Sequence, residues 1–591
     1  MKLVLSGDEA VARGAWQYGV RFAAAYPGTP STEILEALFG FPEVHARWCV
    51  NEKVAFDEAL GASIAGARVL VAMKHVGLNV AADTLMTASY TGVGGGFVVV
   101  SCDDPGMHSS QNEQDNRHYA AFAKIPLLEP TDSQECLEYV GHALEISEKF
   151  DTPVLVRLTT RLSHTRCVVE TDGARRAPEA TAFVRQPEKY VMVPAYARVR
   201  HRLVEERMAA LADFSEGSGL NRVEPGKGDF GLIASGVSYQ YAREAFPDAP
   251  VFKLGFSYPL PIRRLREFVG TVGRAYVVEE LDPFIEERLL AAGIPVRGKA
   301  LMSLCGEYTP RAIRKAINGD LGVLPPPASG ILPPVSDLPP RPPVLCPGCA
   351  HRGIFYALKE LKVNVMGDIG CYTLGALPPL LAMDSCVCMG ASVGMGVGMD
   401  RVSERGRTVA VIGDSTFIHS GIPPLVDMAW NRSAGVLIIL DNRTTAMTGR
   451  QPTAASSPAG TVRELSGDST DGAGPPLNLV RLCQAAGIED VTVIDPYDLD
   501  QVFETLRRAL AGDKPSVIIT NRPCGLLENV QRQEPSAIDA DLCSGCLQCT
   551  ALACPALVVD SDRVAIVEGL CRGCRLCAQV CPLGAAAKRE L

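Results

Sequence analysis

The C-terminal segment 541–582 contains the residues whose spacing points most specifically to a chemistry. Each half of it reads C-x2-C-x2-C, then a short gap, then C-P. Three thiolates this close together can surround one face of an iron–sulfur cubane, and the fourth cysteine of each half reaches the neighbouring cluster. The pattern predicts two [4Fe-4S] clusters. Their ligand sets would be Cys543, Cys546, Cys549 and Cys581, and Cys571, Cys574, Cys577 and Cys554.

The first half of this segment has four residues before its C-P, where the bacterial pattern has three. We therefore expect a small insertion just before Cys554. Structural zinc and disulfides are the alternatives, but the doubled order of the cysteines favours iron–sulfur clusters. The segment resembles a bacterial two-cluster ferredoxin, which implies that the rest of the chain contains an electron source.

Two further polar residues follow near-continuous apolar runs. Asp414 ends the run 408–414, and Asn442 ends the run 435–442. Ligands of open α/β sheets gather at the carboxyl ends of the strands, so these two side chains are expected side by side. Hard oxygen ligands of this kind suit Mg²⁺, which usually also binds substrate phosphates. Upstream, the small residues of 389–400 predict a helix that would let a sheet or a diphosphate approach closely.

The elements around these residues predict several α/β domains. Segment 1–185 alternates strands with helices, and its apolar runs predict a parallel sheet. Segment 186–228 is charged and weakly helical and predicts a connector, while 229–322 predicts a second α/β unit without a G-x-G-x-x-G, so a nicotinamide site is not expected. The proline-rich stretch 323–344 predicts an interdomain linker. The remaining predictions are an α/β domain over 345–530 and the cysteine-rich domain over 536–591.

Polar loops lie between the elements of the first predicted domain. They are residues 25–32, 73–79 and 103–118. The last has no periodicity and is rich in polar and turn residues, which favours an active-site loop. A solvated surface loop is the alternative.

The net charge and the apolar content of the chain indicate which kinds of partner it can bind. The net charge is −10 over 591 residues, which argues against nucleic acid or an anionic membrane as the main partner. No apolar run approaches the ~20 residues of a membrane span. The first residues are acidic where a signal peptide would be apolar. We therefore expect a cytoplasmic protein with reduced cysteines.

The pattern GDS followed by DN-x-T resembles the thiamine diphosphate and Mg²⁺ motif. The resemblance implies that Asp414, the Asn442 side chain and the Thr444 carbonyl bind Mg²⁺, with Gly413 beside them. Ser415 replaces the last glycine of the motif, so the turn there must avoid a positive φ. Glu52 stands where these enzymes carry the glutamate that contacts the aminopyrimidine ring; an exposed carboxylate at a helix start is the alternative.

Several motifs together resemble the large subunit of the indolepyruvate ferredoxin oxidoreductases, in the 2-oxoacid:ferredoxin oxidoreductase family. They are YPGTPSTEI, NEKVA, MKHVGLNVAAD, DDPGMHSSQNEQDNRHYA, CPGCAHR, GDIGCYTLG and GDSTFIHSG. The resemblance implies a pyrimidine domain, a transketolase-C-like domain, a diphosphate domain and a ferredoxin domain, in that order. It also implies a separate small (beta) subunit, a heterotetramer of two large and two small subunits, and ferredoxin as the electron acceptor.

The family implies oxidative decarboxylation of arylpyruvates to acyl-CoA and CO₂, with coenzyme A as co-substrate. Glu52 would hydrogen-bond the pyrimidine ring of the cofactor. Thr29 would contact the substrate or coenzyme A. His75 and Arg117 would meet the carboxylate of the 2-oxoacid, or would only hydrogen-bond within their loops. Two alternatives stay open: the same chemistry on an arylglyoxylate or aliphatic 2-oxoacid, and a non-catalytic electron-transfer subunit.

A third [4Fe-4S] cluster is implied by the related pyruvate and 2-oxoacid enzymes. Their proximal cluster is held by a C-x2-C, a cysteine in an IGC turn and a cysteine after the last strand of the domain. The matching residues are Cys346, Cys349, Cys371 and Cys524. A zinc site and unligated thiols are the alternatives. Electrons that leave the substrate one at a time need a nearby acceptor, which favours the cluster.

Overall fold

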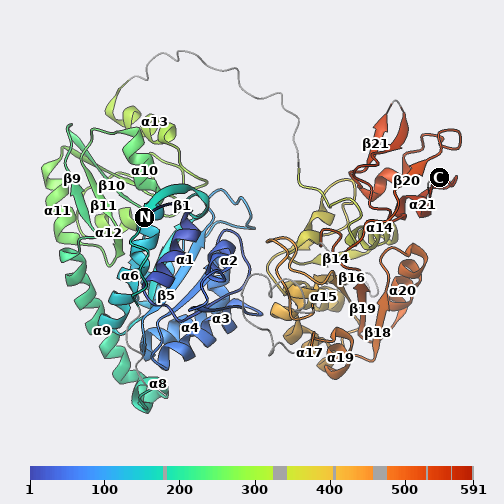
Figure 1. Cartoon of the computed structure of the whole chain (residues 1–591), viewed down its shortest axis with the longest axis horizontal. Helices are drawn as coiled ribbons and strands as arrows, with labels where there is room; N and C mark the ends of the chain where they lie inside the picture. Colours follow the sequence, from blue (N-terminus) through green and yellow to red (C-terminus); the bar gives the residue numbers. More distant parts are fainter. Residues whose placement is uncertain are drawn as a thin grey trace. The chain divides into compact units, whose positions relative to one another are not determined.

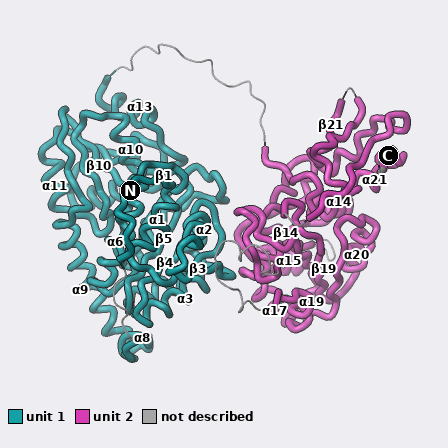
Figure 2. Tube along the Cα trace, viewed as in Figure 1, with its two compact units in different colours: residues 1–334, 465–468 teal, residues 335–464, 469–591 magenta. Residues whose placement is uncertain are grey.

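A computed structural model describes residues 1–176, 183–323, 342–402, 408–456, 475–527, 530–560 and 562–588 (Figure 1). The predicted linker 323–344 lies almost entirely outside these residues. The chain divides into two compact units, one containing the described residues up to 323 and the other those from 342 (Figure 2). No described helix is long and apolar enough to cross a membrane.

The first unit is built on a seven-stranded sheet in the order β12-β6-β7-β5-β4-β2-β3, parallel except for β12 at one edge. Both faces of the sheet are buried by helices, so the central strands are almost entirely apolar. The strands are β2 (Phe22–Ala25), β3 (His45–Trp48), β4 (Val69–Lys74), β5 (Phe97–Asp103), β6 (Leu127–Leu128), β7 (Val154–Thr159) and β12 (Phe256–Tyr258).

Helices α1, α2 and α6 contribute to the hydrophobic cluster on one face of this sheet, and α3 and α4 to the cluster on the other. A two-stranded ribbon, β1 with β8, lies in the same unit. The bounds are β1 (Lys2–Ser6), β8 (Arg166–Glu170), α1 (Gly7–Gln17), α2 (Thr32–Leu38), α3 (Glu52–Ile64), α4 (His75–Thr91), α5 (Arg117–Ala123), α6 (Ser133–Phe150) and α7 (Thr160–His164).

A smaller four-stranded sheet in the order β13-β10-β11-β9 completes the first unit. Its apolar residues join the same hydrophobic cluster as α3 and α4, so the two α/β parts share a core. The elements are β9 (Arg222–Glu224), β10 (Phe230–Ser235), β11 (Val251–Leu254), β13 (Arg274–Val278), α10 (Gly236–Ala245), α11 (Ile262–Thr271), α12 (Phe284–Ala291) and α13 (Pro310–Leu321).

The segment predicted as a weakly helical connector forms a short helix α8 (Pro187–Tyr190) and a 24-residue helix α9 (Pro194–Gly217). Two buried arginines fasten α9 to the first domain. Arg200 donates to the Tyr90 carbonyl and Asp151, and Arg207 donates to the Ser89 and Asp151 carbonyls. The segment is therefore an integral part of the first unit.

The second unit contains a six-stranded parallel sheet in the order β15-β14-β16-β17-β19-β18. The apolar runs that predicted its central strands match them closely. The elements are β14 (Asn364–Gly367), β15 (Ser385–Cys386), β16 (Thr408–Gly413), β17 (Val436–Asp441), β18 (Asp490–Ile494), β19 (Ser516–Asn521), α14 (His351–Leu361), η1 (Cys371–Ala376), α15 (Ala391–Val402), α16 (Asp414–Thr416), η2 (Phe417–Gly421), α17 (Ile422–Trp430), α19 (Leu479–Ala485) and α20 (Leu499–Ala511).

The cysteine-rich segment belongs to the same compact unit as this sheet. It forms two small antiparallel ribbons, β20 with β23 and β21 with β22. Its Leu552 and Leu576 share a hydrophobic cluster with Leu499 of α20 and Tyr356 of α14. The bounds are β20 (Ser536–Ile538), η3 (Gln548–Leu552), β21 (Leu557–Asp560), β22 (Arg563–Ile566), α21 (Leu576–Val580) and β23 (Ala586–Lys588).

Candidate functional site

Asp414 and Asn442 lie at the same edge of the six-stranded sheet. Strands β16 and β17 are parallel neighbours with Gly413 opposite Leu440, so both end at this edge. Asp414 begins α16 immediately after β16, and Asn442 follows the last residue of β17. The expected juxtaposition of a carboxylate and an amide at neighbouring strand ends follows from this register.

The Asp414 carboxylate is buried at 2% exposure, and its Oδ2 atom accepts no hydrogen bond from the described residues. Burial, and after it the negative charge of Asp441, raises the pKa of Asp414 well above its usual value. A buried carboxylate beside a second one is costly unless a cation compensates it. The donor set therefore fits a hard divalent cation such as Mg²⁺.

Asn442 and Thr444 form a tight turn after β17. The Thr444 amide donates to Asn442 Oδ1 at 3.1 Å, and the Thr444 hydroxyl donates to the Gln451 carbonyl at 3.1 Å. Both residues are buried. Across the edge, the Ser415 and Thr445 hydroxyls lie 2.9 Å apart. Ser415 is helical and does not have a positive φ, which confirms the expectation for its turn.

Two residues at this edge were not singled out from the sequence. His351, 3% exposed, lies with Nε2 3.4 Å from Asn442 Nδ2, and burial lowers its pKa to about 4. Asp368, which follows β14, accepts the backbone amides of Gly390 and Ser392 and so fixes the start of α15. Asp368 could have been found from the sequence, because it directly follows an apolar strand, as Asp414 does.

A glycine of α15 allows this helix to pack closely against the sheet. A β-carbon on Gly396 would lie 3.0 Å from the Ala410 β-carbon of β16, so this glycine lets helix and strand pack closely. Gly394 and Gly398 have no atoms within 4 Å of such a carbon. The sequence predicted that this helix would let a sheet or a diphosphate approach closely. Gly396 allows the close approach of the sheet.

Cys346, Cys349, Cys371 and Cys524 are electrostatic neighbours, and Cys524 contacts Asn442. Burial, and next the neighbouring thiols of Cys524 and Cys346, raises the pKa of Cys371 to about 11; Cys349 interacts electrostatically with Cys371 and Cys346. The Cys524 amide donates to the Asn442 carbonyl at 3.0 Å. Four thiols from three separate segments therefore interact with one another, and one of them, Cys524, is hydrogen-bonded to the residue that follows β17.

The C-terminal cysteines lie in two groups. Cys543, Cys546, Cys549 and Cys581 line one cavity. Cys574 and Cys577 interact electrostatically with Cys571 and Cys554. The extra residue before Cys554 is accommodated where Ala553 takes a left-handed conformation, with φ +56°. Gly545 and Gly573, at equivalent places in the two halves, have nearly equal φ of +73° and +75°.

In the first unit, Glu52 is the first residue of α3 and is buried at 5% exposure. The Asn51 side chain caps this helix by accepting the Val54 amide at 2.8 Å. A β-carbon on Gly77 would lie 2.6 Å from Glu52 Oε1. The Glu52 carboxyl therefore lies directly against the first turn of α4, and it is not the exposed helix-start carboxylate of the alternative interpretation.

His75 opens α4 and is fully buried. Its Nε2 lies 3.3 Å from Asn112 Oδ1, and its Nδ1 has no hydrogen-bond partner among the described residues. Burial, followed by the charge of Lys74, lowers its pKa, so the ring is neutral near pH 7. Lys74, which sequence patterns did not single out, donates to the Ser109 carbonyl at 2.6 Å, and burial lowers its pKa to about 8.

Thr29 lies beside the loop 103–118. Its carbonyl accepts the Ser109 hydroxyl at 3.2 Å. Asp104 anchors that loop, because it accepts hydroxyl hydrogens from Ser110 and Thr160 at 2.6 Å each. The loop thus links Thr29, Lys74 and His75 at the carboxyl end of the first sheet, and it is not a freely solvated loop.

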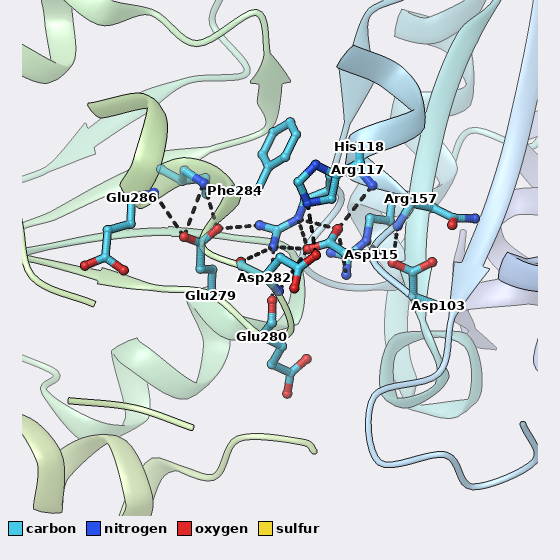
Figure 3. Close-up of polar contacts among 12 residues, drawn as sticks. Asp103, Asp115, Arg117, His118, Arg157, Glu279, Glu280, Asp282, Phe284 and Glu286 are labelled. Atoms are coloured by element: carbon cyan, nitrogen blue, oxygen red, sulfur yellow. Dashed lines mark hydrogen bonds and ion pairs between the residues drawn. The ribbon is translucent and has the colours of Figure 1, made fainter. Parts of the chain in front are cut away.

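Arg117 occupies a different place from the one expected. It is 1% exposed and lies between the two α/β parts of the first unit (Figure 3). Its Nε donates to Asp115 at 2.8 Å, its Nη1 to Glu279 at 2.6 Å and its Nη2 to the Glu280 carbonyl at 3.0 Å. Every guanidinium nitrogen is engaged by protein acceptors, so the expectation that Arg117 meets a substrate carboxylate is corrected: its role is structural.

Comparisons with known proteins agree with this arrangement. Residues 13–204 match the family model described as pyruvate flavodoxin/ferredoxin oxidoreductase, thiamine diphosphate-binding, and residues 368–520 match the thiamine pyrophosphate enzyme C-terminal TPP-binding domain. The chain is 43% identical to "Indolepyruvate oxidoreductase subunit IorA" of Methanothermobacter thermautotrophicus, covering 99% of this chain and 97% of that protein. It is 42% identical to the protein of the same name from Archaeoglobus fulgidus, covering 98% and 96%.

A solved structure, the 2-oxoglutarate:ferredoxin oxidoreductase from Magnetococcus marinus, is a more distant match. It is 20% identical with a TM-score of 0.45, covering 54% of this chain and 65% of that chain.

Proposed function

Because this chain belongs to the indolepyruvate oxidoreductase subunit IorA family of thiamine-dependent 2-oxoacid:ferredoxin oxidoreductases, we propose that it oxidatively decarboxylates arylpyruvates such as indolepyruvate. One 2-oxoacid, one coenzyme A and two oxidised ferredoxins give an acyl-CoA, CO₂, one proton and two reduced ferredoxins. The bond to the carboxylate breaks, the keto carbon loses two electrons, and the thioester bond forms.

The proposed cofactor residues divide between the two units. Asp414, Asn442 and the Thr444 carbonyl would hold Mg²⁺, which would compensate the buried Asp414 charge and supply a binding site for phosphate oxygens. Gly413 and Ser415 form the backbone of that turn. Glu52 hydrogen-bonds the pyrimidine ring. Bound thiamine diphosphate supplies the nucleophilic carbon and the electron sink for decarboxylation.

The substrate side of the proposal rests on the carboxyl end of the first sheet. Thr29 and neutral His75 are the residues that we assign to substrate or coenzyme A binding. The support is the buried His75 Nδ1 atom, which has no hydrogen-bond partner among the described residues. Arg117 is left out because its guanidinium is already engaged.

One contact carries the redox part of the proposal: the Cys524 amide donates to the Asn442 carbonyl at 3.0 Å. A proposed Mg²⁺ ligand is thereby one hydrogen bond from a proposed cluster ligand. Electrons leaving the substrate would enter a [4Fe-4S] cluster held by Cys346, Cys349, Cys371 and Cys524. They would then pass to the two clusters of a C-terminal ferredoxin-like domain and on to ferredoxin.

The proposed enzyme also contains a separate small subunit, with two large and two small subunits per complex. The proposed domain bounds are those inferred from the sequence: 1–185, 186–228, 229–322, 345–530 and 536–591. Within these bounds the segments 1–185 and 229–322 share one hydrophobic cluster, and 536–591 packs against α14 and α20 of 345–530.

Substrate-dependent reduction of a viologen dye by the reconstituted large and small subunits tests this function. Indolepyruvate should give the fastest coenzyme A-dependent reduction, with phenylglyoxylate and pyruvate slower. Faster turnover of either competitor would reassign the substrate, and no reduction with any 2-oxoacid would reject the enzyme activity. Asp427→Ala, an exposed aspartate in the same domain, is the control for loss of activity in Asp414→Ala.

A further inference from the structure

Two of the cysteine loops in the second unit are in direct contact. Gly348 lies within the Cys346–Cys349 loop, and Arg572 lies within the Cys571–Cys574 loop. A β-carbon on Gly348 would lie 2.6 Å from the Arg572 β-carbon, and Gly348 has φ +66°. Only glycine fits this junction without strain. The Cys346 site and the Cys571 site are therefore neighbours.

Arg352 lies buried at this junction, at 1% exposure. Its Nη2 donates to the Leu345 carbonyl at 2.8 Å and to the Cys346 carbonyl at 2.9 Å, while its Nη1 donates to the Leu552 carbonyl. Leu552 lies two residues before Cys554. One guanidinium therefore bonds the backbone of both ligand segments.

The acceptors of Arg352 are all neutral. Among the described residues its hydrogen-bond partners are backbone carbonyls, no ion pair with a carboxylate is found, and its Nε has no partner. A buried cation is retained at a cost unless a negative charge compensates it. The guanidinium interacts electrostatically with Cys349 and with Cys574, which belong to the two neighbouring sites.

We propose that Arg352 is a positioning residue shared by these two cluster sites, and that its buried charge raises the reduction potential of both clusters. This inference rests on the proposed function, because it requires clusters at Cys346, Cys349, Cys371 and Cys524 and at Cys571, Cys574, Cys577 and Cys554. Electrons then pass from the first of these clusters to the second, and the Cys543, Cys546, Cys549 and Cys581 cluster is the exit.

The physical reason is the charge change on reduction. Each one-electron reduction adds a negative charge to a cluster, and a fixed buried cation stabilises the reduced form more than the oxidised form. Burial weakens solvent screening, so one guanidinium can act on two adjacent clusters. Cys546, a ligand in the Cys543 site, is exposed, which suits an exit cluster that meets an external acceptor.

The test is an EPR-monitored redox titration of the reconstituted large and small subunits, with Arg352→Gln, Arg352→Met and Arg352→Lys compared with wild type. The two neutral variants should lower the potentials of the clusters in the Cys346 and Cys571 sites. The potential of the cluster in the Cys543 site should not change. We expect a roughly tenfold fall in the reduced-to-oxidised ratio at a fixed potential, which is about 59 mV for a one-electron couple. Arg352→Lys should restore most of the shift.

Arg563→Gln is the matched control, because Arg563 donates to the Ala540 carbonyl on the Cys543 side and is exposed. It should leave the two Arg352-sensitive potentials unchanged. If neither neutral variant loads iron but Arg352→Lys does, the charge is required at the junction and the inference holds. Loss of iron in all three variants would show that assembly requires the shape of the arginine and not its charge, and would overturn the proposed effect of the charge.

Failure of the inference differs from failure of the proposed function. Three clusters with unchanged potentials in both neutral variants would overturn the role of Arg352 alone. A wild-type enzyme that contains only about eight iron atoms, rather than about twelve, would instead reject the third cluster of the proposed function.

Discussion

Glu52 and Gly77 are packed so closely that residue 77 has no room for a side chain: a β-carbon there would lie 2.6 Å from Glu52 Oε1. The two residues occupy the first turns of adjacent helices, α3 and α4. The glycine thus determines where the buried Glu52 carboxyl lies. If Glu52 orients the cofactor ring, activity depends on this contact as well as on the carboxyl itself.

Gly77→Ala should lower kcat by at least about tenfold, because it displaces the Glu52 carboxyl, and a misplaced catalytic group costs one or more orders of magnitude. Steady-state dye reduction measures this effect, with circular dichroism to verify folding. Gly61→Ala is the control, since Gly61 lies in α3, the helix that Glu52 begins, and no atoms lie near an added β-carbon there. Equal activity of the two variants would contradict the proposed placement of Glu52.

Glu52→Gln should lower kcat by about 100-fold or more while thiamine diphosphate still binds, because proton transfer through a positioned carboxyl typically contributes 10²–10⁴. Cofactor content after gel filtration and the rate of dye reduction separate binding from chemistry. A variant with normal turnover would exclude Glu52 from the reaction.

Asp414→Ala should abolish Mg²⁺-dependent binding of thiamine diphosphate and, with it, activity. The Asp414 carboxylate is buried and its Oδ2 has no protein partner among the described residues, so a cation is the partner that it lacks. Fluorescence titration of thiamine diphosphate with and without Mg²⁺ measures the change. Iron content should be retained; unchanged cofactor affinity would reject the Mg²⁺ assignment.

Cys346→Ala and Cys524→Ala should each lower the iron content of the full-length chain from about twelve atoms to about eight. Cys386→Ala should not, because its thiol donates to the Asp368 carbonyl and lies outside the four-thiol group. Full-length variants are preferable to deleting the C-terminal segment, since Leu552 and Leu576 share a core with Leu499. Twelve iron atoms in Cys524→Ala would reject the third cluster.

Glu280 predicts a pH dependence of stability in the first unit. Burial raises its pKa to about 7, so the folded state binds this proton more tightly than the unfolded chain does. Stability should therefore fall as pH rises from about 4.5 to about 7, by roughly 2–3 kcal/mol over the whole window.

Glu280→Gln should reduce that slope and be more stable than wild type at pH 8, whereas Glu267→Gln, at an exposed position, should behave as wild type. Urea unfolding between pH 5 and pH 8 measures both. An unchanged slope in Glu280→Gln would show that another group is responsible.

Local patterns located β16 and β17 to within about a residue, because strands buried on both faces are continuous apolar runs. The same patterns could not place Arg117. Its partner Glu279 lies 162 positions away in the second α/β part, so its ion pair is a product of tertiary packing. Arg352 and its C-terminal partner Leu552 are 200 positions apart in the chain, so local sequence patterns could not predict this contact either.

The central claim is that one reaction couples decarboxylation, thioester formation and electron export. The most direct measurement is the stoichiometry of a single reaction mixture of reconstituted enzyme, indolepyruvate, coenzyme A and ferredoxin. The account predicts one CO₂ and one acyl-CoA for every two ferredoxins reduced, and none of the three products with Asp414→Ala. Release of CO₂ without reduced ferredoxin, or with an aldehyde in place of the acyl-CoA, would contradict it.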